Sequence, residues 1–192
     1  TGPTAVGKTK LSIELAKRLN GEIINADSTQ VYKGLDIATA KIKENEKEGI
    51  PHHLFDIKNI DENYTVYDYQ KDGRICIDEI LQKGKTPIIV GGTGLYINAL
   101  LYDYKFERIW KKPDYDIETL KRYNKLKEID PNTSIHMNNR KRVERAYSYY
   151  LKTGKCFSEK EITHKLLYNT IFIGLTTDRS ILYDKINKRV DN

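Results

Sequence analysis

Residues Thr1-Gly2-Pro3-Thr4-Ala5-Val6-Gly7-Lys8-Thr9 open the chain, and they decide its fold. Their spacing matches the phosphate-loop pattern G-x-x-x-x-G-K-[ST], whose fixed positions are occupied by Gly2, Gly7, Lys8 and Thr9. The glycines allow a tight turn that brings backbone N–H groups close to phosphate oxygens, and the helix that follows adds the positive end of its dipole. Lys8 adds a point charge, and the Thr9 hydroxyl is a ligand for a Mg²⁺ ion that bridges phosphates. We therefore predict a phosphorylated ligand with Mg²⁺ as cofactor; a glycine turn that merely caps a helix is the alternative.

A buried strand normally leads into such a loop and forms the middle of the sheet. No residue that could form this strand stands before Thr1 in the sequence. We therefore expect the natural chain to begin upstream of Thr1.

Helical and strand-like patterns alternate after the loop. Leu11, Leu15 and Leu19 recur on one stripe of a helix, whereas Ile88-Ile89-Val90 is a continuous apolar run typical of a buried parallel strand. Strands are predicted at residues 22–26, 51–57, 88–90 and 170–175, and helices at residues 10–19, 65–81, 95–101, 138–152 and 178–192. This alternation predicts an α/β fold of the P-loop NTPase type, with a doubly wound parallel sheet.

The polar segment 102–134 has weak periodicity, and it is predicted to be a small helical insertion between the core residues 1–101 and 135–192. Two local signals mark the ends of helices. Thr65 has the hydroxyl of an N-cap, and Gly154 suits the left-handed residue that ends a helix.

Composition and charge narrow the class of protein. The 192 residues are 39% hydrophobic and 31% charged, which is typical of a folded domain. No apolar run approaches the roughly 18 residues of a membrane span, and no signal-peptide pattern opens the chain. Cys76 and Cys156 lack metal-ligand spacing, so we expect a cytoplasmic chain with reduced thiols. We also expect a monomer with no membrane partner. The net charge of +6 suits a polyanionic partner.

Seven motifs resemble one family, the tRNA dimethylallyltransferases, also called tRNA isopentenyltransferases. They follow the family's order along the chain and read GPTAVGKT at 2–9, DSTQVY at 27–32, DIATAK at 36–41, PHHL at 51–54, GGTGLY at 91–96, IHMNNRKRVER at 135–145 and TDRSILYDKINKRVD at 177–191. Together they are far more specific than the phosphate loop alone. The resemblance implies transfer of a dimethylallyl group to the exocyclic amine of the adenine just 3′ of the tRNA anticodon.

The resemblance also implies an unusual ligand for the loop. Instead of the γ-phosphate of ATP, the loop would bind the diphosphate of dimethylallyl diphosphate, and Arg179 would clamp it. The strand at Ile88 agrees with this, because it ends in Gly-Gly-Thr and not in the acidic residue of an ATPase. Lys8, the loop amides and Mg²⁺ on Thr9 would stabilise the charge that grows on the leaving diphosphate. An ordinary surface arginine is the alternative for Arg179.

Asp27 is the candidate general base, because it ends a predicted buried strand near the loop and could take a proton from the attacking amine. A Mg²⁺-water ligand and a helix cap are the alternatives for this residue. Thr93 would hydrogen-bond the same amine or the diphosphate, and a helix N-cap is an equally open interpretation. Lys8 completes the predicted catalytic set.

Two segments are predicted to bind the tRNA anticodon loop. Asp27-Ser28-Thr29-Gln30, with Thr93, forms a polar edge that could read an adenine flipped out of its stack. The segment Lys141-Arg142-Val143-Glu144-Arg145 lies on a basic helix that would hold phosphate or a neighbouring base. A solvated basic face is the alternative for that helix. His52-His53 lacks further ligand candidates at useful spacing and is predicted to be structural.

The chain departs from the family pattern in three places. The first strand is absent, the insertion between Tyr102 and Ile135 is short, and the basic extension beyond the last helix is missing. We predict omitted residues before Thr1, within residues 102–135 and after Asn192, with a shortened protein as the alternative. Three other classes stay open: a P-loop small-molecule kinase, a transferase that prenylates free adenine nucleotides, and a non-catalytic RNA-binding NTPase switch.

Overall fold

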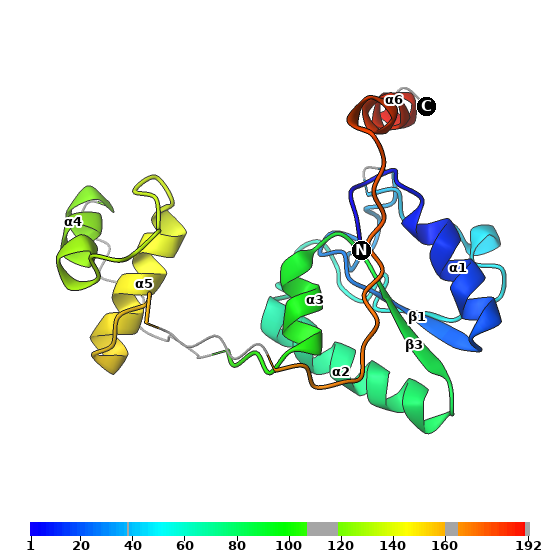
Figure 1. Ribbon diagram of the computed structural model, residues 1–192, viewed down its shortest axis with the longest axis horizontal. Coiled ribbons are helices and arrows are strands. Elements are labelled where there is room, and N and C mark those ends of the chain that lie inside the picture. Colours follow the sequence, from blue (N-terminus) through cyan, green and yellow to red (C-terminus); the bar gives the residue numbers. More distant parts are fainter. Residues whose placement is uncertain (38, 107–118, 160–164, 191–192) are drawn as a thin grey trace. The chain divides into compact units, whose positions relative to one another are not determined.

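The computed structural model describes residues 1–37, 39–106, 119–159 and 165–190 (Figure 1). Contacts divide the chain into two compact units: Thr1–Tyr104 with His164–Asn192, and Lys105–Thr163. The omission predicted within residues 102–135 falls largely on residues 107–118, which lie outside the described ranges.

The first unit is built on a parallel sheet, which has three strands within the described residues, in the order β2-β1-β3. The strands are β1 (Gly21–Asn25), β2 (His52–His53) and β3 (Thr86–Val90). Ile23 of β1 stands opposite His52 on one side and Ile88 on the other. All residues of β1 are buried, as expected for a strand with a neighbour on each side and helices on both faces.

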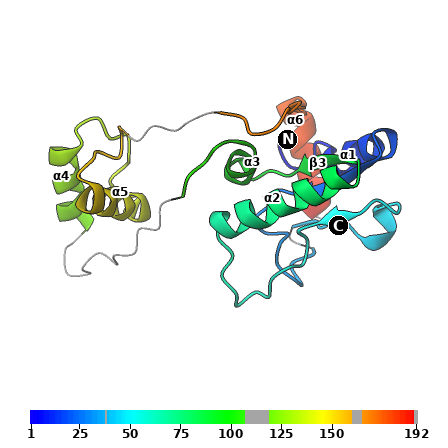
Figure 2. The same ribbon diagram turned by 90° about the horizontal axis from the view of Figure 1, so that it is seen from below.

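Adjacent isoleucines of β1 point to opposite faces of the sheet, because side chains alternate along a strand. Ile23 packs with Ile13 of α1 (Lys8–Arg18), whereas Ile24 packs with α2 (Val66–Gln82) and α3 (Gly94–Leu101). Helices therefore cover both faces, with α1 on one and the α2–α3 pair on the other (Figure 2). The predicted α/β class with a parallel sheet is confirmed.

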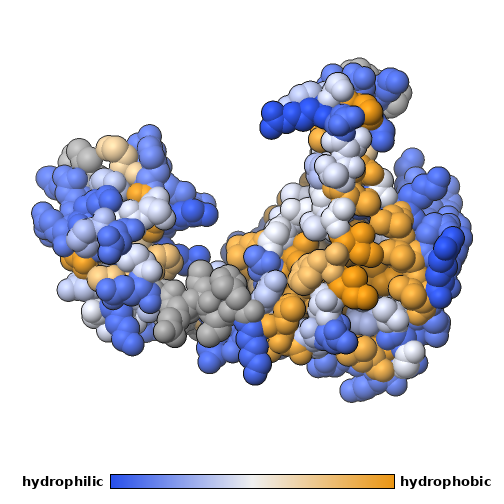
Figure 3. All heavy atoms as spheres, in the orientation of Figure 1, coloured by the Kyte–Doolittle hydropathy of each residue, from blue (hydrophilic) through white to orange (hydrophobic). Residues whose placement is uncertain are grey.

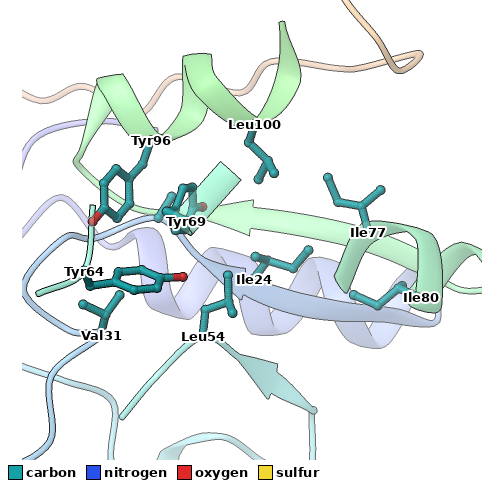
Figure 4. Close-up of a cluster of buried hydrophobic side chains, with 10 residues drawn as sticks. Ile24, Val31, Leu54, Tyr64, Tyr69, Ile77, Ile80, Tyr96 and Leu100 are labelled. Atoms are coloured by element: carbon teal, nitrogen blue, oxygen red, sulfur yellow. The ribbon is translucent and has the colours of Figure 1, made fainter. Parts of the chain in front are cut away.

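The larger core lies between β1 and the α2–α3 pair (Figure 4). The rings of Tyr69 and Tyr96 stack there with their centroids 4.0 Å apart. A Cβ added to Gly73 of α2 would lie 2.8 Å from a methyl carbon of Leu100 in α3. The glycine therefore allows the two helices to approach closely.

Both predicted helix-end signals are confirmed. The Thr65 hydroxyl accepts a hydrogen bond from the Asp68 N–H, and the Asp68 carboxylate accepts one from the Thr65 N–H, which is a capping box at the start of α2. Gly154 ends α5 (Arg140–Thr153) with a left-handed φ of 68°.

The second unit is built around a helix pair, α4 (Thr119–Ile129) and α5. Leu126 of α4 packs against Val143 and Ala146 of α5 in a small core. The compact unit differs from the predicted insertion at residues 102–134: it extends to Thr163, because α5 packs on α4.

The strand predicted at residues 170–175 does not form. The Thr1 amine donates to the Ile173 carbonyl at 2.8 Å, and the Leu175 N–H donates to the Thr1 carbonyl at 2.9 Å. Two parallel strands are bonded in this way, but here Thr1 alone bonds to residues 173 and 175, so no ladder forms. The apolar run is therefore extended without being a strand, and α6 (Arg179–Val190) follows it.

The strand predicted at residues 51–57 is much shorter than expected. β2 contains only His52 and His53. Leu54 and Asp56 adopt left-handed backbone, with φ values of 62° and 54°, and this conformation interrupts a strand.

An apolar groove of about 740 Å³ lies between β3 and residues 167–175. α1 contributes Leu11 and Leu15 to its lining, and α2 and α3 contribute Leu81 and Leu101. Figure 3 shows the apolar side chains that gather on this side of the first unit. The strand predicted before Thr1 stays a prediction.

Candidate active site

The phosphate loop and the residues that follow β1 and β3 surround a cavity of about 280 Å³. From these segments its lining consists of Thr4, Ala5, Gly7, Lys8, Thr9, Asp27, Gln30, Val90 and Gly91. Carboxyl ends of parallel strands meet at one edge of a sheet, which is where α/β proteins bind ligands. The structure thus brings together seven of the predicted site residues, namely Thr4, Ala5, Gly7, Lys8, Thr9, Asp27 and Gln30.

The path of the loop depends on glycines. Gly7 is the N-cap of α1 with a φ of 98°, and Gly2 has a φ of 145°. A Cβ added to Gly2 would lie 2.5 Å from the Leu175 carbonyl oxygen, so no larger residue fits without a shift of the backbone. The first N–H groups of α1 have no acceptor within the helix, which makes this helix end favourable for an anion.

The ammonium of Lys8 lies across the loop. Its Nζ donates to the carbonyl oxygens of Gly2 at 2.9 Å and of Pro3 at 2.7 Å. A cation held at a helix N-terminus is the arrangement that phosphate groups bind.

Asp27 follows β1 directly, in a turn that orients its carboxylate. Its N–H donates to the Asn25 side chain at 2.9 Å, and its Oδ1 accepts from the N–H and the hydroxyl of Thr29 at 2.9 and 2.6 Å. A turn and not a helix follows, so the helix-cap alternative for Asp27 is wrong. Its second oxygen, Oδ2, has no hydrogen bond among the described residues, and it can accept a proton or bind a cation.

Thr93 occupies the N-cap position of α3, but its side chain makes no capping hydrogen bond. Its Oγ1 instead accepts from the Ser28 N–H at 3.0 Å and donates to the Ser28 hydroxyl at 3.3 Å. The Thr93 N–H donates to the Ala26 carbonyl at 3.0 Å. The chain after β3 is therefore bonded to the residues on both sides of Asp27. Gln30 lines the cavity, whereas Ser28, Thr29 and Thr93 are not among its lining residues.

Sequence reasoning missed nine lining residues, namely Ser12, Ile23, Thr39, Ala40, Ile42, His52, Phe55, Val90 and Gly91. His52 is half-buried, with Nδ1 2.7 Å from the Ile50 carbonyl and its ring in edge contact with Phe55 at 5.7 Å. Burial lowers the pKa of His52 and so favours the neutral imidazole. The sequence could have predicted the place of His52, because this residue belongs to a predicted strand of the same parallel sheet, and such strands end at one edge.

Arg179, the predicted diphosphate clamp, is the exposed first residue of α6. It is not among the residues that line the cavity. The structure therefore does not place Arg179 in this cavity, and its role as a diphosphate clamp stays a prediction.

The basic helix α5 belongs to the second unit. Lys141, Arg142 and Arg145 are exposed. Val143, however, is fully buried in the α4–α5 core, so its side chain is not available to RNA, contrary to the prediction. The Glu144 carboxylate binds other residues of the protein, because it accepts hydrogen bonds from Arg122 at 3.1 Å and from Arg140 at 2.9 Å.

A family model described as IPP transferase matches residues 30–192. The chain is 54% identical over 202 residues to the tRNA dimethylallyltransferase of Anoxybacillus flavithermus, which covers 99% of this chain and 64% of that protein. The chain thus spans a little less than two thirds of the length of this curated relative.

Two solved structures are also similar. A tRNA delta(2)-isopentenylpyrophosphate transferase from Staphylococcus epidermidis is 47% identical with a TM-score of 0.67, covering 100% of this chain and 66% of that one. A eukaryotic dimethylallyltransferase acting on tRNA is 36% identical with a TM-score of 0.86, covering 99% of this chain and 50% of that one. Both structures are similar to this chain in sequence and in fold over nearly its whole length.

Proposed function

Since this chain belongs to the IPP transferase family, we propose that it transfers a dimethylallyl group from dimethylallyl diphosphate to an adenine of tRNA. The acceptor is the exocyclic amine of the adenine 3′ of the anticodon, and diphosphate is released. One observation carries the proposal: Lys8, Thr9 and Asp27 share a single cavity. A cation at a helix N-terminus suits the diphosphate, and the carboxylate beside it can take a proton.

The donor would bind at the phosphate loop. Cleavage of the allylic C–O bond leaves positive charge on the alkyl group and negative charge on the departing diphosphate. Lys8 and the first N–H groups of α1 stabilise that negative charge. Ala40, Ile42 and Phe55 line the same cavity and offer apolar surface to the alkyl group.

Mg²⁺ is the cofactor that a diphosphate donor implies. The described residues hold no group of three or more His, Cys, Asp or Glu side chains that could bind a metal ion. The hydroxyl of Thr9 is nevertheless an oxygen ligand of the kind Mg²⁺ prefers, and substrate phosphates usually complete such a site. A Mg²⁺ ion bound there would neutralise charge on the diphosphate.

The acceptor amine would meet Asp27. Its Oδ2 takes the proton that the amine loses as the new C–N bond forms, and a positioned base of this kind contributes about 10²–10⁴-fold to the rate. The Thr93 hydroxyl donates to Ser28 and accepts from Ser28, which leaves one lone pair for an amine N–H. Gln30 lines the same cavity and supplies further polar contact to the base.

The tRNA backbone would be held by the second unit. Lys141, Arg142 and Arg145 present exposed cations on α5, and such residues position RNA through its phosphates. None of the helices in the described ranges is long and apolar enough to cross a membrane. We also propose a monomeric cytoplasmic enzyme whose catalytic core has the P-loop NTPase-like arrangement.

A single transfer assay tests the proposal. Dimethylallyl diphosphate with a labelled alkyl group is incubated with tRNA and Mg²⁺, and parallel reactions replace the tRNA by AMP or the donor by ATP. Label is expected on tRNA only. Label on AMP would support the free-nucleotide alternative, and ATP consumption without alkyl transfer would support the kinase alternative. The relatives' names favour neither.

A further inference from the structure

The side chain of Lys41 is buried although it carries a charge. Its exposed fraction is 5%, and its Nζ donates to three oxygens: the Tyr32 carbonyl at 2.8 Å, Asp36 Oδ1 at 2.7 Å and Asp56 Oδ1 at 2.5 Å. An ammonium group has three protons, so these three bonds use all of them. Lys41 is not a lining residue of the catalytic cavity.

The three acceptors tie together the segments that form one wall of that cavity. Tyr32 follows β1 and lies two residues after Gln30; Asp56 follows Phe55; and Asp36 belongs to the loop that carries Thr39 and Ala40. The side chain of Ile37 in this loop is 97% exposed, whereas Ile42, directly after Lys41, packs against the core of α1 and β1. Lys41 is thus the cation that joins the loop to the strand ends on either side.

The same loop orients a predicted site residue. Gln30 Nε2 donates to the Thr39 carbonyl at 2.9 Å, which turns its other amide atom, Oε1, away from that bond. If the loop moves, the Gln30 amide loses the partner that orients it. Removal of Lys41 would also leave the two carboxylates facing each other without their cation.

We propose that Lys41 is a positioning residue, which holds the Gln30–Thr39 wall of the cavity in place for the acceptor base and does not contribute to binding of the donor's diphosphate. The inference rests on the proposed function, because it names the acceptor side of the same site. The donor is held by the phosphate loop, which Lys41 does not contact in the described hydrogen bonds. Loss of Lys41 should therefore affect the two substrates differently.

The test compares Lys41→Met with the control variant Lys58→Met, which removes an ion pair to Glu62 at 3.2 Å between more exposed side chains. Amide hydrogen exchange is measured at residues 39–42, where the Ala40 N–H bonds to the Ile37 carbonyl and the Lys41 N–H to the Asp36 carbonyl. Affinity for inorganic pyrophosphate and KM for tRNA are measured on the same proteins. Where Lys41→Met does not fold, Asp56→Asn replaces it, because that change removes the charge of the Lys41–Asp56 ion pair and so weakens the link between the loop and the segment after β2.

Faster exchange at residues 39–42, a higher KM for tRNA and unchanged pyrophosphate affinity are expected for Lys41→Met, with kcat/KM lowered by up to about 10²-fold, as for other misplaced site groups. Lys58→Met should match the wild type in all three measurements. Unchanged exchange, or an equal loss of pyrophosphate affinity, would overturn the inference. Hydrogen exchange does not depend on turnover, so absence of any transfer by the wild type would count against the proposed function and not against the role of Lys41.

Discussion

The Thr93 hydroxyl accepts a hydrogen bond from the Ser28 N–H at 3.0 Å, although the two residues are 65 positions apart in the chain. This bond joins the ends of β1 and β3 beside the carboxylate of Asp27. A Cβ added to Gly91 would lie 2.1 Å from the Ala26 carbonyl oxygen, so the two strand ends can approach this closely only with glycine there. The geometry of the candidate site therefore depends on a backbone contact as much as on its polar side chains.

Gly91→Ala is expected to destabilise the protein by about 1–3 kcal/mol, the usual effect of forcing an extra carbon into a packed site. Gly92→Ala is the matched control, because a Cβ at Gly92 would meet no atom within 4 Å. Urea denaturation of both variants measures the difference. Equal stability of the two would show that the strand ends can move apart without cost.

Asp27→Asn is expected to lower the single-turnover rate of transfer by about 10²–10⁴-fold, because an amide cannot take the proton that a general base removes. Donor binding should survive, since Lys8 and the loop amides remain. The rate and the donor Kd are measured across Mg²⁺ concentrations. A rate restored by added Mg²⁺, together with weaker donor binding, would instead identify Asp27 as a metal ligand.

Lys8→Ala is expected to weaken donor binding and to slow turnover together, because the same ammonium faces the diphosphate before and after the C–O bond breaks. Its bonds to the Gly2 and Pro3 carbonyls are also lost, so thermal unfolding is measured to exclude collapse of the loop. A variant with wild-type kcat and KM for the donor would contradict the assignment of the loop to the diphosphate.

The buried carboxylate of Glu22 predicts acid sensitivity of the fold. It accepts from Lys85 Nζ at 2.8 Å and lies 2.7 Å from His53 Nε2, and the hydrogen bond from Lys85 is the main reason that its pKa is lowered to about 2. The ordinary pKa of this carboxyl group is 4.5, and its lower pKa in the folded chain means that the carboxylate stabilises the fold at pH values above 4.5. This stabilisation is lost as the pH falls toward 2.

The free energy of unfolding should therefore decrease from pH 4.5 to pH 2 in the wild type, and this decrease should be smaller in Glu22→Gln. Urea titrations at several pH values measure both slopes. Glu14→Gln, which changes an exposed residue of α1, is the control and should follow the wild type. Parallel slopes for Glu22→Gln and the wild type would mean that Glu22 does not contribute to this pH dependence.

Salt dependence tests the basic helix. Each phosphate contact with a single-stranded region contributes about −0.7 to the slope of log K against log salt, so replacing Arg142 and Arg145 by Ala should make the slope for tRNA binding less negative by about 1.4. Arg140→Ala should change it less, because the Arg140 Nε already donates to Glu144 at 2.9 Å. Pyrophosphate binding should not change. An unaltered slope in the double variant would assign these arginines to a solvated surface.

Local features of the sequence were sufficient for much of the fold. The glycine spacing of the phosphate loop, the Thr65 capping box and the Gly154 helix end each depend on a few consecutive residues, and the structure has all three. The apolar runs at β1 and β3 predicted a parallel sheet for the same reason, although β1 is fully buried whereas Ile88, Ile89 and Val90 of β3 are only half-buried. Each of these features depends on neighbouring residues in the chain, so the sequence alone is enough to predict it.

Contacts between distant segments decided the rest. Residues 170–175 have the composition of a strand but do not form one, because a strand is completed by a neighbour along its length and not by its own residues. Val143 sits in a basic run, yet its packing against α4 buries it. The meeting of Lys8 with Asp27, the bond from Ser28 to Thr93 and the burial of Lys41 between two carboxylates all depend on where the strands end in space. Sequence determined which residues could form the site, and only the tertiary structure brought them to one cavity, because the packing of segments far apart in the chain decides which residues line it.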